Sequence, residues 1–420
     1  MTSDWDVIVI GAGPAGSVAA RQLALSGRRV LLLDKKRFPR RKVCGACLNH
    51  AAVRLLEEIG LGDVLSDSGS VELSGFDLRA SSRRLSLPLP SGRAISRTVL
   101  DQKLVDAAIH AGVTFQDGVS ATVGKIHGDR RSVELKYASD RLTATPSACA
   151  ALECAPSACA ASELIPRPAH ADGVAVKQAK IILAADGLGH PSLCNLREVR
   201  DQTMRSSRIG AGCEVTEFPA EYTSGVIHMA VGRGGYVGLV RVESGALNIA
   251  AAFDARLIRE SGGLALAAVG VLTQAGFPAI PAMTQADWIG TPALTRSTSP
   301  VAAERLFVLG DASGYVEPFT GEGMGWALAS AIALAPLAGA ACDDWQPALA
   351  KAWLREHSRL VRRRQRVCRM LAAFLRFPVC VRWAMFLLPK IPSLLQPLVR
   401  GVSLPQEAAR PMAGIPFFDQ

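Results

Sequence analysis

The sequence predicts an α/β fold in which a parallel-sheet domain receives an inserted mixed-sheet domain and is followed by a C-terminal helical tail. Three observations predict it: a strand, glycine turn, helix and strand at the start of the chain, alternating apolar runs in its middle, and a basic and apolar stretch at its end. We expect the parallel-sheet domain at residues 1–72, 93–205 and 295–345, the inserted domain at 73–92 and 206–294, and the tail at 346–420.

The opening segment, residues 6–34, reads DVIVIGAGPAGSVAARQLALSGRRVLLLD. Its β-branched run at 7–10 is typical of a buried parallel strand, and the small apolar residues of 17–26 recur at helical spacing. A second apolar run at 30–33 predicts a second strand. This order of strand, helix and strand is the unit of a Rossmann-like dinucleotide-binding domain.

The turn of this unit has the spacing GxGxxG, and each glycine has a mechanical reason. Gly11 makes the tight turn, Gly13 lets a pyrophosphate approach the backbone, and Gly16 lets the helix pack close to the strand. The start of the helix presents free N–H groups to phosphates. Asp34 stands 18 residues after Gly16, where an acid binds a ribose hydroxyl. The dinucleotide-binding candidates here are Gly11, Gly13, Pro14, Ala15, Gly16 and Asp34.

Positive charge is concentrated near the end of the chain. Residues 351–400 contain 12 of the 47 Lys and Arg residues but one of the 37 acidic residues, Glu356, which leaves 35 basic against 36 acidic residues elsewhere. The net charge of +10 therefore comes from this one segment, and the rest of the chain is nearly neutral. We expect no nucleic-acid partner, and a local anionic partner for this segment.

The first residues and the cysteines indicate a compartment. Asp4 and Asp6 precede the first apolar run, which argues against a secretory signal, and ten cysteines in 420 residues do not form a disulfide framework. We expect a cytoplasmic protein, with the inner face of the membrane as an alternative position. Proline or arginine interrupts the apolar runs at 323–342 and 371–389, so we expect neither to span a membrane.

Two segments of the first half have no assigned function. Residues 143–172 contain the pentapeptide PSACA twice, at 146–150 and 156–160, and this low complexity predicts a surface insertion. The CxxC at Cys44 and Cys47 has no further ligands at zinc spacing, so we expect no metal. A catalytic dithiol remains an alternative to two small side chains beside a glycine turn.

The rest of the chain alternates expected strands with expected helices. Arg97 opens one of these helices, where it either braces a phosphate or is a solvated surface arginine. Strands are expected within 72–95 and at 113–115, 132–137, 180–185, 210–215, 236–242, 247–253 and 305–309, and helices at 49–60, 95–110, 264–274 and 326–341.

Three glycine-bearing segments follow predicted strands: GAGPAG at 11–16, ADG at 185–187, and LGDASG with PFTGEGM within 309–324. Together they resemble the FAD-dependent oxidoreductases of the hydroxylase-like superfamily, and within it the geranylgeranyl reductase-like flavoproteins. The resemblance covers roughly residues 5–345, and its third segment is the most specific.

By this resemblance the first segment holds the ADP half of FAD, and Asp311 contacts the ribityl or pyrophosphate region. The helix start at 321–324 would lie near the pyrimidine edge of the flavin, where a helix N-terminus stabilises the negative charge of the reduced ring. Besides the residues of the first turn and Asp34, the cofactor-binding candidates are Lys42, Arg97, Asp186, Gly310, Asp311, Pro318, Gly321, Glu322, Gly323 and Met324.

The resemblance also indicates a substrate pocket, with Lys42, Cys44 and Tyr236 as candidates. The segment KVCG at 42–45 is similar to the reductase pattern beside the flavin ring, and Tyr236 matches a tyrosine of the pocket wall. Where the family has Trp at 238 and Phe-Pro at 240–241, this chain has Gly238, Val240 and Arg241, so we expect a wall of different volume and polarity. No catalytic base is assigned.

The resemblance implies an FAD-dependent oxidoreductase that reduces an apolar isoprenoid, lipid or polyketide-like substrate by flavin hydride transfer. A flavin-dependent monooxygenase is one alternative, and a membrane-associated electron-transfer flavoprotein that feeds quinone is another. Because the chain has a single GxGxxG, no second dinucleotide domain is expected. NAD(P)H and a reduced carrier are the candidate electron donors.

The basic tail predicts one amphipathic helix over residues 354–376, with six arginines on one stripe and apolar residues opposite. The apolar, proline-containing stretch at 377–399 follows. Such a composition is typical of an interfacial membrane contact, here through 354–399, unless the apolar face packs on the FAD-binding domain. The stripe consists of Arg355, Arg359, Arg362, Arg366, Arg369 and Arg376.

Overall fold

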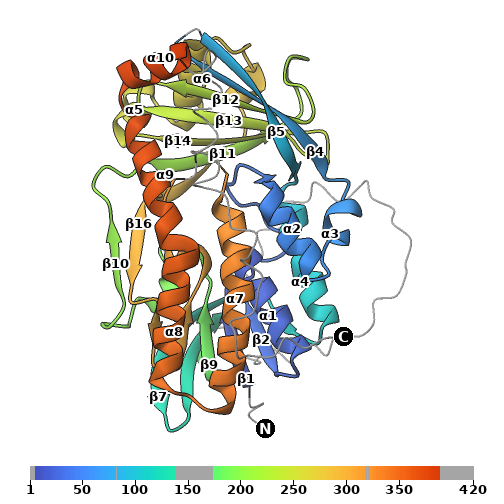
Figure 1. Cartoon of the computed structure of the whole chain (residues 1–420), viewed down its shortest axis with the longest axis vertical. Helices are drawn as coiled ribbons and strands as arrows, with labels where there is room; N and C mark the ends of the chain where they lie inside the picture. Colours follow the sequence, from blue (N-terminus) through green and yellow to red (C-terminus); the bar gives the residue numbers. More distant parts are fainter. Residues whose placement is uncertain (1–4, 82, 138–173, 318, 320, 388–420) are drawn as a thin grey trace.

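The computed structural model describes residues 5–81, 83–137, 174–317, 319 and 321–387. Two large sheets lie one above the other in Figure 1, and a run of C-terminal helices extends along both of them. The repeated pentapeptide of the 143–172 insertion and Pro318 lie outside the described residues.

The lower sheet is a parallel sheet with an antiparallel extension. Its parallel strands follow the order β18-β9-β1-β2-β6, and residues of the four strands other than β6 are buried on both faces, as expected for β-branched and leucine-rich strands between helices. The strands are β1 (Trp5–Ile10), β2 (Val30–Leu33), β6 (Thr114–Gln116), β9 (Val174–Ala184) and β18 (Leu306–Val308), with β7 (Val119–His127), β8 (Arg130–Tyr137) and β17 (Ala302–Ala303) paired at the sides.

Helices α1, α4 and α7 pack with this sheet into the main hydrophobic core. α1 (Pro14–Leu25) begins three residues before the expected 17–26, because proline suits the first helical position. α2 (His50–Glu58) and α4 (Arg97–His110) start at Asn49 and Ser96, whose side chains accept hydrogen bonds from Ala52 N and Val99 N. α3 (Asp63–Ser66) follows α2.

α7 (Gly323–Asp343) is the helix of the described chain that is long and apolar enough to cross a membrane. Its most apolar window is 78% buried inside the protein, between the parallel sheet and the neighbouring helices. This burial is typical of the core helix of a globular protein.

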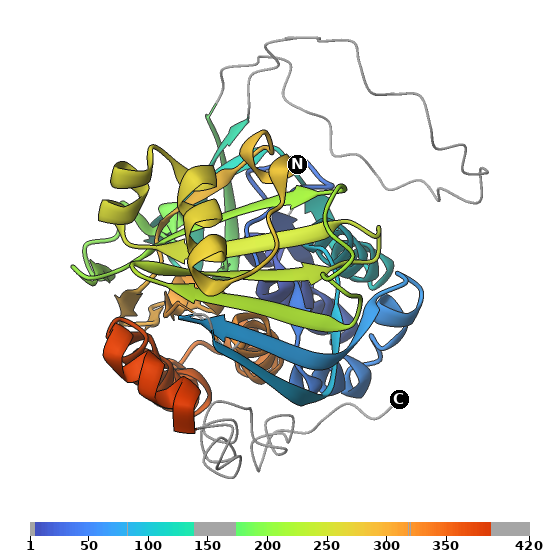
Figure 2. The ribbon, with the colours of Figure 1, turned by 90° about the horizontal axis from the view of Figure 1, so that it is seen from above.

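The upper sheet is mixed, in the order β15-β11-β14-β13-β12-β4-β5-β3. Helices α5 (Ala255–Ser261) and α6 (Leu264–Ala275) cover its outer face, whereas its inner face points toward the parallel sheet (Figure 2). The strands are β3 (Cys47–Leu48), β4 (Val71–Ala80), β5 (Arg83–Ala94), β11 (Ile209–Val215), β12 (Val226–Gly232), β13 (Gly235–Arg241), β14 (Leu247–Phe253) and β15 (Ile289–Ala293).

Strands β4 and β5 come from the first quarter of the chain, yet they join this later sheet through the parallel pair β12–β4. The sequence pattern did not predict β12, because VIHMAVG lacks alternation and contains the buried His228. A third, small sheet joins β10 (Arg200–Thr203), β16 (Arg296–Ser299) and β19 (Gly314–Tyr315).

The C-terminal helices are part of the core. α8 (Pro347–His357), a π-helical turn at Ser358–Arg362 and α9 (Arg363–Phe374) form one continuous run, and α10 (Pro378–Leu387) follows. The buried Trp353 donates from Nε1 to Val308 O at 3.1 Å, and Gln365 donates to Gly314 O at 2.9 Å. These contacts hold the run against the third glycine-bearing segment.

The prediction that six arginines share one exposed stripe is wrong for two of them. The π-helical turn changes the helical phase. Arg362 consequently turns inward and donates to Thr298 O at 3.1 Å. Arg376 binds Asp254 at 2.9 Å and also donates to Ser206 O. The apolar face, including Leu360 and Val361, packs into the core.

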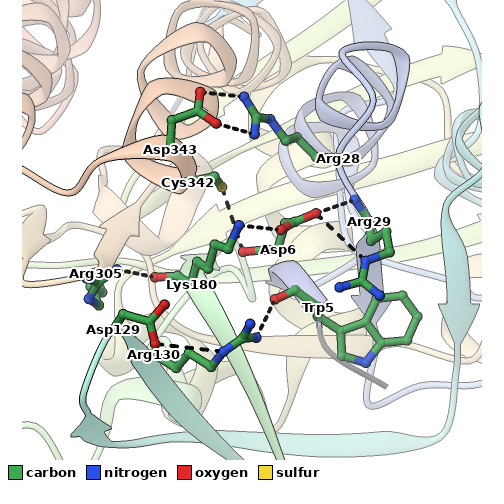
Figure 3. A network of polar contacts seen from close by, with 10 residues as sticks. All are labelled: Trp5, Asp6, Arg28, Arg29, Asp129, Arg130, Lys180, Arg305, Cys342 and Asp343. Carbon is green, nitrogen blue, oxygen red and sulfur yellow. Dashed lines mark hydrogen bonds and ion pairs between the residues drawn. The ribbon is translucent and has the colours of Figure 1, made fainter. Parts of the chain in front are cut away.

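A polar network joins the elements at the edge of the parallel sheet that lies away from the glycine turns (Figure 3). Both guanidinium NH₂ groups of Arg28 donate to the carboxylate of Asp343 at 2.6 Å, which links the end of α7 to the loop before β2. Lys180 of β9 pairs with Asp6 of β1 at 3.0 Å. Because these pairs are partly exposed, we assign them a modest contribution to stability.

Candidate functional site

A cavity of about 1100 Å³ lies between the two sheets. One end, which we call the cofactor cradle, is lined by Gly13, Pro14, Ala15, Lys42, Arg97 and Asp311. The other end, which we call the apolar chamber, is enclosed by β4, β5, β12 and β13 and by α9 and α10. The chamber is lined by Phe76, Leu78, Leu85, Leu87, Met229, Val231, Tyr236, Leu371, Leu375, Val381 and Met385.

The sheet order brings the three glycine-bearing bends together. Strands β18, β9 and β1 are neighbours, so the segments that follow them leave the same edge of the sheet. A Cβ on Gly11, whose φ is +103°, would lie 2.4 Å from Ala185 O of the second bend. A Cβ on Gly310 of the third bend would lie 2.8 Å from the Cβ of Ala15 in the first. The bends are therefore in direct contact.

Gly16 allows helix α1 to lie against the turn before it. A Cβ at this position would be 1.8 Å from Gly11 O, a distance that no side chain can occupy. This is the close packing of helix and strand that the sequence spacing predicts. Gly11, Gly16 and Gly310 shape the cradle from behind, since they are not among the residues that line the cavity.

The cradle has the features that a diphosphate requires. α1 begins at Gly13 without a side-chain cap, so the N–H groups of its first turn face the cavity. The position of a Cβ on Gly13 is 3.5 Å from Arg97 NH2 and 3.8 Å from Arg40 NH2. Arg40 Nε is buried without a hydrogen-bond partner among the described residues. The space in front of Gly13 is thus open, lined with donors and positive.

A chain of buried ion pairs fixes these arginines. Arg97 donates from Nε and NH2 to the two oxygens of Asp101, both at 2.8 Å, and its side chain is 7% exposed. Arg40 pairs with Asp101 at 3.2 Å and with Asp34 at 3.4 Å. Burial disfavours the charge of Arg97, but Asp101 together with Cys44 and Asp311 more than offsets burial and raises the pKa of Arg97. The alternative of a solvated surface arginine is therefore wrong for Arg97.

The sequence analysis missed Arg40 and Asp101. A signal existed for each: Arg40 lies in the basic loop that follows Asp34, and Asp101 stands four residues after Arg97 on the same helix. What the sequence could not show is that the loop folds back and places Arg40 between two carboxylates.

Two predicted acidic residues hold loops instead of lining the cavity. Asp34 accepts hydrogen bonds from Ala12 N and Lys36 N, both at 2.9 Å, so it ties the glycine turn to the end of β2. Asp186 accepts from Ser192 N at 2.8 Å, and burial raises its pKa. Asp186 lies behind the cavity wall, which Ala185 and Gly187 form.

Lys42 and Cys44 line the cavity, as predicted from KVCG. Lys42 Nζ is 3.1 Å from the position of a Cβ on Gly187, which places it beside the second bend. Burial, and then Arg97, lower the pKa of Lys42.

In the CxxC segment, burial raises the pKa of the Cys47 thiol, which disfavours a thiolate, and the Sγ of Cys47 lies 3.0 Å from Gly45 O. The described residues contain no cluster of metal-ligating side chains.

The third bend lines the cavity through Gly321, Glu322, Gly323 and Met324. Glu322 is 5% exposed, and its Oε2 has no hydrogen-bond partner among the described residues. Burial raises the pKa of Glu322 to about 7, an effect that Asn49 and Arg364 only partly offset. Tyr315 of the same segment also lines the cavity and is a site residue that the sequence analysis did not name.

The missing tryptophan of the family pattern has a clear consequence for the chamber wall. Gly238 lines the cavity, and a Cβ there would meet the end of Met229 at 3.2 Å and Ala250 O at 3.7 Å. Arg241 does not line the cavity: its guanidinium lies 5.3 Å from the centre of the Phe218 ring. The predicted change in the volume of the chamber wall is therefore present. The prediction that Arg241 makes this wall more polar is wrong.

Tyr236 lines the chamber where the upper sheet meets the third bend. Its ring meets Phe319 edge to face at 5.3 Å, and the guanidinium of Arg208 lies 5.5 Å from its centre. Glu317 Oε1 is 3.5 Å from Arg208 NH1 and 3.9 Å from Arg376 NH2. This buried group joins the third bend, the upper sheet and the end of α9.

Comparisons with known proteins match this architecture. Residues 4–146 match the family described as FAD binding domain. A 140-residue alignment is 38% identical to menaquinone reductase of Mycobacterium tuberculosis and covers 32% of this chain and 34% of that protein. Menaquinone reductase of Mycolicibacterium smegmatis is 28% identical over 334 residues, 78% of this chain and 75% of that protein.

A further relative is digeranylgeranylglycerophospholipid reductase 1 of Methanothermobacter thermautotrophicus, which is 35% identical over 27% of this chain and 29% of that protein. Among solved structures, a flavin-dependent brominase has a TM-score of 0.71 at 14% identity, with 95% of this chain and 93% of that chain covered. That likeness concerns the fold. The comparisons confirm the predicted FAD-binding α/β fold and indicate an FAD-dependent enzyme.

Proposed function

We propose that this chain, which fits the FAD-dependent hydroxylase-like superfamily, is a reductase of an isoprenoid-bearing lipid. The observation that carries the proposal is the continuity of the cavity: the cofactor cradle and the apolar chamber share one volume of about 1100 Å³. An apolar chain held in the chamber therefore reaches the cofactor without leaving the protein. A site of this size with apolar walls and few polar groups suits a lipid better than a polar metabolite.

The residues of the cradle fit FAD. The first turn of α1 with Arg97 and Arg40 would hold the diphosphate, and the start of α7 would stabilise negative charge on the reduced ring. FAD supplies a hydride when it is bound and reduced. The chain itself binds and orients the lipid and excludes water through the apolar chamber.

Reduction of a carbon–carbon double bond needs a proton as well as a hydride. Glu322 Oε2 is buried at the cavity wall without a hydrogen-bond partner among the described residues. With a pKa raised to about 7 by burial, this carboxyl group holds a proton at neutral pH and can release it. Glu322 is our candidate for the proton donor, a role for which the sequence analysis named no residue.

The relatives support the lipid class. Menaquinone and digeranylgeranylglycerophospholipid, which name two of them, are both lipids with long isoprenoid chains. What they share is an apolar, unsaturated chain attached to a more polar group. We propose that the chamber takes such a chain.

The test is reduction of a menaquinone without oxygen. The purified yellow protein is reduced anaerobically with NADPH, NADH or dithionite and mixed with menaquinone in detergent. We expect re-oxidation of the flavin and a product that has gained two hydrogen atoms and keeps them after exposure to air, because a saturated double bond does not re-oxidise.

Other results would identify the alternatives. A gain of two hydrogens that is lost in air would show reduction of the quinone ring and favour the electron-transfer flavoprotein. A gain of one oxygen atom, which requires O₂, would show a monooxygenase. Reduction by NADPH or NADH at a useful rate would identify the donor, and reduction by dithionite alone would favour a reduced carrier.

A further inference from the structure

The outer face of α9 and α10 exposes an unusual amount of apolar surface. Among the described residues, twelve large hydrophobic side chains are exposed, and six of these lie between positions 370 and 387. Met370 is 73% exposed, Phe377 61% and Trp383 58%. Single exposed hydrophobic residues are ordinary, but six within two neighbouring helices and the turn between them mark an interaction surface. The six are Met370, Phe374, Phe377, Trp383, Phe386 and Leu387.

Positive charge surrounds this apolar surface. Residues 358–387 contain eight arginines and no acidic residue. Two of the eight, Arg362 and Arg376, are turned into the protein, whereas Arg363, Arg366, Arg369 and Arg382 are exposed. The exposed Arg83 of β5 adds to the same region, with its guanidinium 5.3 Å from the Phe386 ring.

This surface is continuous with the entrance of the apolar chamber. Met370 and Phe374 line the cavity and are also exposed, and so are His50 and Arg54 of α2. The cavity therefore opens between α2 and α9. Figure 1 shows α9 and α10 beside the upper sheet, whose strands β4 and β5 contact α10.

We propose that the exposed face of α9 and α10 docks on an anionic lipid bilayer and places the entrance of the chamber at the bilayer surface. Apolar side chains among arginines are the composition of a helix that lies in a membrane interface. An anionic protein could match the arginines, but continuity with a chamber lined by apolar residues favours lipid. Delivery of a lipid substrate through this face rests on the proposed function, whereas docking itself does not.

The test is co-sedimentation of the FAD-loaded full chain with vesicles of phosphatidylcholine alone or mixed equally with phosphatidylglycerol. We expect binding to the mixed vesicles to exceed binding to the neutral ones by at least tenfold. Each arginine near an anionic surface contributes about fivefold to affinity, so Arg363→Ala with Arg366→Ala should lower it about 25-fold. Trp383→Ser with Phe377→Ser should also reduce binding, by removing the inserted side chains.

Matched controls lie on the far side of the upper sheet. Arg259→Ala on α5 and Leu266→Ser on α6 remove an exposed arginine and a 52% exposed leucine, and both should leave vesicle binding unchanged. Equal loss of binding in these controls would overturn the proposal. Equal binding to neutral and anionic vesicles would also overturn the proposal, because the arginines would then contribute nothing to vesicle affinity.

Failure of docking and failure of the proposed function give different results. If the wild type binds no vesicles but reduces menaquinone dispersed in detergent, the docking proposal alone is wrong, and another protein or residues 388–420 occupy this face. If the protein binds anionic vesicles but reduces no isoprenoid lipid, docking is supported and the proposed function is wrong.

Discussion

The cofactor cradle and the apolar chamber are two ends of one cavity, but different forces hold them. At the cradle, backbone bends touch at distances that admit no side chain, and the charges of Arg40, Arg97 and Asp101 are paired inside the protein. At the chamber, strands from the first quarter of the chain meet helices from its last quarter mainly through apolar contacts. Interlocked bends and buried charges tolerate little change, whereas apolar walls tolerate repacking.

The largest effect should follow from Gly16→Val, which attacks the cradle directly. The new Cβ would lie 1.8 Å from Gly11 O, so the turn or α1 must move. We expect colourless protein without FAD, and unfolding in urea at a free energy lower by about 4 kcal/mol or more. Gly270→Ala is the matched control, since a Cβ there meets nothing within 4 Å. Normal FAD content in Gly16→Val would show that the bends are not interlocked.

The second effect concerns the charges of the cradle. Asp101→Asn leaves Arg97 and Arg40 buried with less compensating negative charge, which should lower the free energy of unfolding by about 3–5 kcal/mol. Saturating FAD should recover part of this loss, because its diphosphate supplies negative charge beside the same arginines. Urea unfolding with and without FAD measures both quantities.

Asp106→Asn is the control for this experiment, because Asp106 lies on the same helix and accepts a hydrogen bond from Gln102 on a partly exposed face. It should change stability by less than about 1 kcal/mol and leave the effect of FAD unchanged. An equal loss of unfolding free energy in both variants would mean that the buried ion pairs of Asp101 stabilise the protein no more than an ordinary surface hydrogen bond does.

The same contrast explains what the sequence could predict. The cradle depends on short segments, GAGPAG, ADG and GDASG with GEGM, in which local spacing sets the geometry. Once β18, β9 and β1 are neighbours, these segments meet without further information. Arg40, Asp101 and Tyr315 escaped prediction. The position of Arg40 depends on the path of the loop after Asp34, which does not follow from periodicity.

The chamber carries no such signal. The alternation of residues 73–92 placed this segment with 206–294 in the inserted domain, but the sequence did not indicate that the partner of β4 is β12, some 150 residues later. The π-helical turn at Ser358–Arg362, where Arg362 turns inward, was also hidden, as was the ion pair of Arg376 with Asp254 beyond the end of α9. The pairing of β4 with β12 and the helical phase of the C-terminal run are set by tertiary packing, which local sequence patterns do not show.

A smaller effect is expected where the two regions meet, at Glu322. Its pKa is about 7 in the folded protein against 4.5 ordinarily, so between these values the unfolded chain releases a proton that the folded chain keeps. Stability conferred by the neutral carboxyl is therefore full below pH 4.5 and is lost as the pH rises toward 7. Glu322→Gln should remove this dependence and raise the free energy of unfolding at pH 8 by about 2 kcal/mol.

Urea unfolding at pH 5 and pH 8 checks this prediction, with the exposed Glu58→Gln as the control. The same variant tests the role in proton transfer: its rate of lipid reduction should fall and lose its dependence on pH near 7, while its flavin spectrum stays normal. If Glu322→Gln keeps the pH profile of the wild type in both measurements, Glu322 is ionised in the folded protein and another group supplies the proton.

The smallest effect should come from narrowing the chamber with Gly238→Leu. A Cβ at this position meets the flexible end of Met229 at 3.2 Å and is at ordinary contact distance, 3.7 Å, from Ala250 O, so the side chain can enter the cavity without displacing backbone. FAD content should stay at the wild-type level, and stability should change by about 1 kcal/mol. The KM for a long-chain menaquinone should rise about tenfold, which corresponds to the loss of a few buried methylene groups, while that for a short-chain analogue changes little. Equal effects on both chain lengths would place the lipid chain outside the chamber, and a loss of FAD would show that chamber and cradle are not the separable regions described above.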